Sequence, residues 1–97
     1  MHLHPVHIDH PEVHAIQPTW HCLQRFRERH RFAPGVDAAV AALAAALQEA
    51  EITTRPPRGV RARGDWTLWA VAGELAFPLT RGPGGTYVAP TCLTPSR

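Results

Sequence analysis

Apolar positions between residues 19 and 50 recur at the spacing of two amphipathic helices. The first is expected to begin after Thr19, which suits the N-cap position, and to run to about Phe32. The apolar arc of this helix contains Trp20, Cys22, Leu23, Phe26 and His30. Pro34 and Gly35 interrupt the pattern, and a second helix is expected over residues 36–50 with Asp37 in its first turn. The buried stripe of this second helix consists of Val36, Val40, Leu43, Leu47 and Ala50.

After Thr54 the pattern changes to the alternation of β-strands. Residues 66–72 and 75–80 alternate on either side of Gly73 and Glu74, and glycine at the first central position favours a two-residue type II′ turn. This hairpin pairs residues 72 with 75, 70 with 77, and 68 with 79. The shared apolar face consists of Leu68, Ala70, Ala72, Leu75, Phe77 and Leu79.

A further strand is expected over residues 86–93, after the turn at residues 82–85. If Arg81 lies opposite Thr86, this strand adds Val88, Pro90 and Cys92 to the apolar face. Trp69, Tyr87 and Thr91 then lie on the opposite face. Bulges or unpaired positions are expected at Pro78 and Pro90, because proline cannot donate a ladder hydrogen bond. Residues 52–55 form a possible fourth short strand. The predicted fold is therefore α+β, with two N-terminal helices packed on one face of a three- to four-stranded antiparallel sheet.

Residues 1–17 show no sustained period and are interpreted as an extended, histidine-rich arm preceding a single domain at 18–97. We expect the core to fold without this arm. The arm contains His2, His4, His7, His10 and His14. A structural zinc site needs four ligands on a fixed scaffold, and these spacings match no zinc-finger pattern, so adventitious metal affinity is favoured over a metal site. No cofactor is expected, and metal handling by the arm is kept as a third hypothesis.

Length and composition place limits on the class of protein. A chain of 97 residues builds one modest core. No apolar run reaches the roughly 18 residues of a membrane span, and no secretory signal is legible, so we expect a cytoplasmic protein that does not enter the membrane. Two cysteines, Cys22 and Cys92, are too few for a disulfide framework and are expected to be free thiols.

Charge is polarised along the chain. All ten basic residues are arginines, and residues 52–97 contain six of them against two acids. Four of these arginines fall within nine residues without an intervening acid: Arg55, Arg58, Arg61 and Arg63. That density suits a polyanionic partner such as RNA, with a solvated loop as the alternative.

A stripe on the first predicted helix carries the chemistry of greatest interest. His21, Arg25 and Arg29 are spaced i, i+4 and i+8, so they share one side of the helix. Imidazole moves protons near neutral pH and guanidinium binds phosphate oxygens, which is what metal-free RNA cleavage requires. The alternative is an exposed basic face whose arginines pair with Glu28 and other carboxylates.

The string HCLQRFRER, followed by a second helix and a sheet ending in VAPTCL, resembles a family of small uncharacterised bacterial domains with a His-x3-Arg-x3-Arg first helix. That family is similar to the barnase, colicin and RelE-like superfamily of metal-independent endoribonucleases, many of them toxins. The resemblance implies that His21 transfers protons, that Arg25 and Arg29 clamp phosphate, and that Thr91 contributes from the last strand. It also implies an antitoxin or immunity protein as a partner.

RNA recognition is assigned to the four loop arginines and to two aromatic residues of the outer sheet face. Trp69 and Tyr87 are expected to stack bases there; the alternative is that these rings cover a small sheet or are buried beneath the N-terminal arm. The favoured hypothesis is a toxin-like, metal-independent endoribonuclease that cleaves RNA by attack of the 2′-OH. The alternative is a non-catalytic RNA- or protein-binding accessory module that uses the same arginine-rich face.

Overall fold

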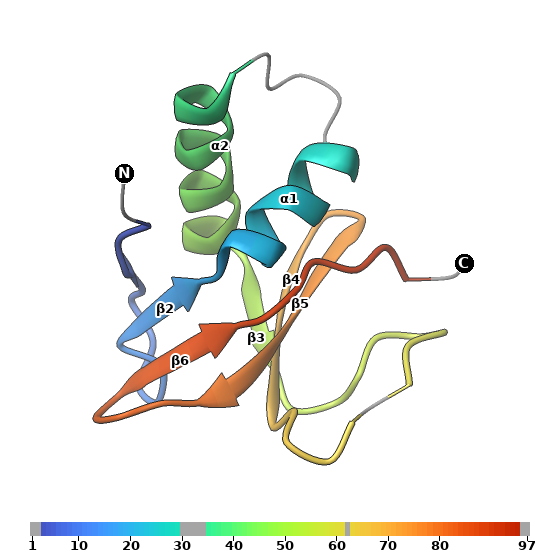
Figure 1. Ribbon diagram of the computed structural model, residues 1–97. Helices are drawn as coiled ribbons and strands as arrows, with labels where there is room; N and C mark the ends of the chain where they lie inside the picture. Colours follow the sequence, from blue (N-terminus) through green and yellow to red (C-terminus); the bar gives the residue numbers. More distant parts are fainter. Residues whose placement is uncertain (1–2, 30–34, 62, 96–97) are drawn as a thin grey trace.

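The computed structural model describes residues 3–29, 35–61 and 63–95, and within them the fold is α+β, as expected (Figure 1). Its elements, in chain order, are β1 (Val6–His7), β2 (Ala15–Pro18), α1 (Trp20–Arg29), α2 (Val36–Glu49), β3 (Glu51–Thr53), β4 (Leu68–Ala72), β5 (Leu75–Arg81) and β6 (Thr86–Ala89). No helix in these ranges is both long and apolar enough to cross a membrane.

The strands form one sheet that curls around α2. The strand order is β1-β2-β6-β5-β4-β3, and every neighbouring pair is antiparallel except β2 with β6. Helix α2 contacts β1 at one edge of the sheet and β4 close to the other edge. The prediction of three to four antiparallel strands with both helices on one face is therefore only partly met. The observed sheet is six-stranded and mixed.

The N-terminal segment belongs to the sheet, which corrects the expectation of an extended arm. Strand β2 runs parallel to β6, with Ile16 opposite Tyr87 and Pro18 opposite Ala89, and β1 pairs with β2. Val13 and Ile16 are fully buried in the core. Because β2 and its partner are about 70 residues apart in the chain, the local pattern of residues 1–17 held no trace of the pairing.

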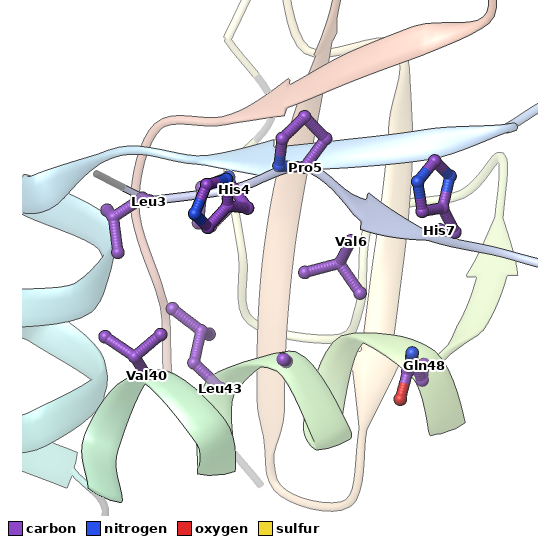
Figure 2. Close-up of a pocket in the computed structure, with 10 residues that line it drawn as sticks. Leu3, His4, Pro5, Val6, His7, Val40, Leu43 and Gln48 are labelled. Atoms are coloured by element: carbon purple, nitrogen blue, oxygen red, sulfur yellow. The ribbon is translucent and has the colours of Figure 1, made fainter. Parts of the chain in front are cut away.

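The same segment also packs on α2. Leu3 and Val6 point toward Val40 and Leu43 across a small, mainly apolar cavity, which His7 and Gln48 also line (Figure 2). The backbone here is held by the Gln17 side chain, whose Nε2 donates to the carbonyl oxygen of Leu3 at 2.8 Å. Residues 3–18 therefore contribute to the core of the domain.

The β4–β5 hairpin forms in the predicted register. Residues 72 and 75, 70 and 77, and 68 and 79 are paired. Gly73 has a φ of +59° and Glu74 has no positive φ, the combination that a type II′ turn requires. The predicted apolar face therefore points into the core, where Phe77 and Leu79 are fully buried.

The β5–β6 register differs from the prediction by one residue. Arg81 lies opposite Tyr87 instead of Thr86, because Gly82, expected in the turn, pairs with Thr86: its backbone N–H bonds to the carbonyl oxygen of Thr86, which leaves only residues 83–85 in the turn. A slip of one residue moves each side chain to the other face of the sheet. Tyr87 and Ala89 therefore enter the core, and the expected outward position of Tyr87 was wrong.

The expected bulge at the prolines is present. Thr80 pairs with Val88, and the next contact between the two segments joins Ala76 to Leu93. The four residue steps from Thr80 to Ala76 in β5 therefore match five steps from Val88 to Leu93. The extra residue of the bulge lies in this second segment, which contains Pro90. The C-terminal segment is bent away from β5 at this point.

Helix α1 begins as predicted. The Thr19 Oγ1 accepts a hydrogen bond from the backbone N–H of Cys22 at 3.0 Å, which is the N-cap interaction. Trp20, expected on the buried arc, is instead 51% exposed, because Cys22, Leu23 and Phe26 fill the core side. The expected end of the helix near Phe32 lies outside the described residues.

Helix α2 follows its prediction in outline. Leu43 and Leu47 are buried, as expected, but Val36 is exposed and Ala39 occupies the interior at the first turn. The helix has Gly35 at its N-cap and Asp37 in its first turn.

Phe77 provides a direct test of the core. Its side chain is fully buried, with its ring centroid 6.4 Å from that of Phe26. Replacing Phe77 with alanine is expected to lower the free energy of unfolding by about 3–5 kcal/mol, measured by urea denaturation. The matched control is Trp20→Ala at an exposed ring, where a change within about 0.5 kcal/mol is expected. Equal effects of the two substitutions would contradict the assignment of the core.

Candidate functional site

The polar stripe of α1 lines one open groove. His21, Arg25 and Arg29 are all exposed and all contribute to its wall. The stripe faces solvent because Cys22, Leu23 and Phe26 hold the other side of the helix against the core. The i, i+4, i+8 spacing thus places the three side chains in one row, as the sequence indicated.

Thr19 ties this row to the end of β6. Its backbone N–H donates to the carbonyl oxygen of Ala89 at 3.2 Å, and its hydroxyl lies 3.0 Å from the carbonyl oxygen of Pro90. The residue that caps α1 therefore also fixes where the chain enters Thr91. As a result Thr91, which is half-buried, lines the same groove as His21.

The third wall comes from the end of the loop between β3 and β4. The groove is lined by His21, Arg25, Arg29, Arg63, Asp65, Trp66, Thr80, Pro90, Thr91 and Leu93. Its volume is about 580 Å³, within the roughly 300–1,000 Å³ range of ligand sites. Helix, strand end and loop thus converge on one open site of ligand size.

The groove carries an excess of positive charge. Three arginines and one histidine line it against a single acid, Asp65, among the described residues. Arg25 forms a 3.0 Å ion pair with Glu28, but both side chains are nearly half exposed, so the pair is weak and can open for a ligand. Arg29 and Arg63 form no ion pair with another described residue. Their charge is available to an anion.

The two cysteines beside the groove are not nucleophiles. Both side chains are fully buried and unbridged. Burial raises the pKa of the Cys92 thiol to about 12, although the nearby Arg29 guanidinium acts in the opposite direction. Burial also raises the pKa of the Cys22 thiol far above its ordinary value. Both thiols therefore stay protonated at neutral pH, and nucleophilic chemistry at sulfur is excluded there.

The four loop arginines are divided among different surfaces. Arg63 lines the groove, and Arg61 lines an adjoining hollow that shares Arg29 with it. Arg55 lines a separate hollow beside β3, and Arg58 is exposed on the loop away from these hollows. The structure thus brings Arg61 and Arg63, but not Arg55 or Arg58, to the α1 stripe.

The aromatic residues assigned to base stacking are not available for it. Trp69 is 1% exposed and Tyr87 is 6% exposed. Tyr87 is buried by the register slip, and Trp69 is covered on the outer face of β4, where Trp66 packs edge-on at 5.4 Å between ring centroids. The expectation of two exposed stacking rings was therefore wrong.

Asp65 and Trp66 are groove residues that the sequence analysis did not indicate. Trp66 begins the segment 66–72 that the alternation predicts as a strand, yet it lies before β4, is only half-buried and lines the groove. The Arg63 guanidinium carbon lies 5.5 Å from its ring centroid. The available signal was the i, i+3 spacing of Arg63 and Trp66 around Gly64 and Asp65, which is typical of a turn.

His2 lies outside the described residues, and the described histidines of the N-terminal segment form no metal-binding cluster. In the part of the chain that the structure describes, no group of three or more His, Cys, Asp or Glu side chains is placed to hold a metal ion. His10 has a local role instead, since its Nδ1 accepts hydrogen bonds from the backbone N–H groups of Glu12 and Val13. This arrangement stabilises the turn between β1 and β2.

Comparison with known proteins adds no identification: no family model, no curated protein and no solved structure matches this chain. The function must therefore be argued from the groove.

Proposed function

We propose that this protein is a metal-independent endoribonuclease of the toxin type. The observation that carries the proposal is the convergence of His21, Arg25, Arg29, Arg63 and Thr91 on one open groove. The first three come from one helix, and the other two come from a loop and the chain end beyond β6. Proton transfer and phosphate binding are thus available at the same place.

The proposed reaction is attack of a ribose 2′-OH on the neighbouring phosphorus. The P–O5′ bond breaks, the 2′-oxygen loses its proton, and the leaving 5′-oxygen gains one. The products are a 2′,3′-cyclic phosphate and a 5′-OH, and no metal or cofactor is consumed. His21 is assigned to one proton transfer. Asp65, the one carboxylate among the described lining residues, is the available second group.

The arginines have a separate task, which is to stabilise the negative charge that builds on the phosphorane. Arg29, from α1, and Arg63, from the loop before β4, both line the groove and form no described ion pair, so they are assigned as the principal clamps. Arg25 joins them after leaving Glu28. The Thr91 hydroxyl donates to a phosphate oxygen. Arg61 extends the binding surface, and Arg55 and Arg58 are left out of the RNA contact.

The second candidate function is a non-catalytic RNA- or protein-binding module. The observation that favours it is the Arg25–Glu28 ion pair, which is the arrangement expected of a solvated basic helix face. This candidate keeps RNA binding in the groove but excludes cleavage. Measurements of binding and of turnover therefore separate the two functions.

A cytoplasmic ribonuclease requires an inhibitor, and the groove indicates its chemistry. An antitoxin or immunity protein with an acidic segment would complement the excess of positive charge along His21, Arg29 and Arg63. Such a segment would compete directly with RNA for the same residues.

RNA binding is tested by salt dependence. Arg63→Ala or Arg29→Ala is expected to weaken binding of single-stranded RNA and to reduce the slope of log K against log salt by about 0.7, because each removes one phosphate contact. Arg27→Ala on the same helix and Arg58→Ala on the same loop are matched controls outside the groove, and their slopes are expected to be unchanged. Equal slopes for all four variants would place the RNA elsewhere.

A further inference from the structure

The groove continues past Trp66 into the adjoining hollow, so the two hollows form one continuous surface for a substrate. The second hollow is lined by Arg29, Gly59, Val60, Arg61, Arg63, Trp66, Leu93 and Thr94. Four of these residues also line the first groove, Trp66 among them. The indole therefore lies where the two hollows meet, with His21 on one side and Arg61 on the other.

Trp66 is held in place by its neighbours. Its ring meets Trp69 edge-on, with the planes at 88°, and Trp69 is buried and fixed by β4. Its backbone N–H donates to the carbonyl oxygen of Arg63 at 3.0 Å, closing a turn that brings the Arg63 guanidinium over the ring. The indole is thus a supported surface that is still partly open to solvent.

A partly exposed indole flanked by arginines is an arrangement by which proteins bind single-stranded nucleic acids, because every base has a face that can stack. The contact with Arg63 is an exposed cation–π interaction, which is weaker than stacking of a base. A base can therefore replace the guanidinium on the ring while Arg63 turns to a phosphate. A duplex hides its base faces and cannot use the ring in this way.

We propose that Trp66 is a base-stacking residue that makes the two hollows one track for single-stranded RNA, with a phosphate near Arg29 and Arg63 and the next near Arg61. The inference rests on the proposed function and adds to it the substrate class and a positioning residue. It requires that an oligonucleotide spanning Trp66 binds more tightly than one that fills the first groove alone.

The test uses the full chain and 2′-O-methyl oligouridylates of two, four and six nucleotides, which cannot undergo 2′-OH attack. Affinity is expected to rise from the dinucleotide to the tetranucleotide. Trp66→Ala is expected to weaken tetranucleotide binding by about 5- to 140-fold, the range for loss of one stacked base. Trp66→Phe keeps a ring and is expected to retain most of the affinity. Trp20→Ala, at an exposed indole outside the track, is expected to bind as the wild type does.

A fluorescence measurement guards against misfolding of the alanine variant. Binding is expected to quench indole emission in the wild type and in Trp20→Phe, but much less in Trp66→Phe. Equal binding by wild type and Trp66→Ala, or equal dependence on Trp66 for a duplex, would overturn the inference while leaving the ribonuclease proposal intact. Absence of any RNA binding by the wild type would overturn both.

Discussion

Replacing His21 with alanine is expected to slow RNA cleavage by about 10²–10⁴-fold, the usual contribution of a general acid or base. The side chain is exposed in the groove and belongs to the surface of α1, so its removal leaves the core untouched. RNA affinity is expected to stay close to that of the wild type, because the arginines remain. Single-turnover cleavage and equilibrium binding, measured on the same RNA, separate these effects.

His7→Ala is the matched control, since His7 is an exposed histidine on β1 outside the groove. Its cleavage rate is expected to equal that of the wild type. If the two histidine variants lost activity equally, His21 would have no special place in the reaction. If His21→Ala lost binding and cleavage together, the imidazole would be a contact residue and not a proton-transfer group.

Deleting residues 1–17 is expected to unfold the domain. The deletion removes β1 and most of β2, and with them the buried side chains of Val6, Val13 and Ile16. Burial of three such side chains contributes roughly 5–9 kcal/mol, against a total stability of about 5–15 kcal/mol for a small domain. The deletion also exposes the edge of β6, because β2 is the neighbour of β6 in the sheet. Circular dichroism during heating is expected to show no cooperative transition.

The control for the deletion keeps the strands and changes only exposed histidines. A double substitution of His4 and His7 by serine is expected to melt close to the wild-type temperature. A truncated chain 18–97 that melted cooperatively near the wild-type temperature would instead restore the interpretation of residues 1–17 as a dispensable arm.

Local signals in the sequence were sufficient for the elements that depend on neighbouring residues. Gly73 specified the turn of the β4–β5 hairpin, and alternation on both sides specified its register. Thr19 was identified as the cap of α1 from its position before the apolar arc. In each case the deciding interactions lie within a few residues of one another, so that spacing alone reports them.

Long-range strand pairing and the burial that depends on it could not be predicted from local spacing. The parallel ladder of β2 with β6 joins residues about 70 positions apart, and no local period records it. Tyr87 changed face because Gly82, expected in the turn, pairs with Thr86 and so shifts the register by one residue. Trp69 is covered by Trp66 from the loop before β4, which an alternating pattern does not reveal.

The candidate site also contains residues whose position follows from local spacing and residues whose position depends on long-range contacts. The row of His21, Arg25 and Arg29 was predictable, because a helix places i, i+4 and i+8 side by side. Thr91 reaches that row only through the hydrogen bonds of Thr19 to the end of β6. The path of the loop decides which of its arginines line the groove. The cluster of four arginines therefore predicted a positively charged site, but not that Arg61 and Arg63 are the two that reach it.

The central claim is that this groove cleaves RNA by attack of the 2′-OH without a metal ion. Its most direct test is incubation of purified protein with end-labelled RNA in EDTA, beside the same RNA carrying a single 2′-O-methyl group at the main cleavage position. The account predicts products ending in a 2′,3′-cyclic phosphate from the first RNA and loss of that cleavage in the second. No cleavage of the unmodified RNA at high enzyme concentration, or cleavage that ignores the 2′-O-methyl group, would contradict it.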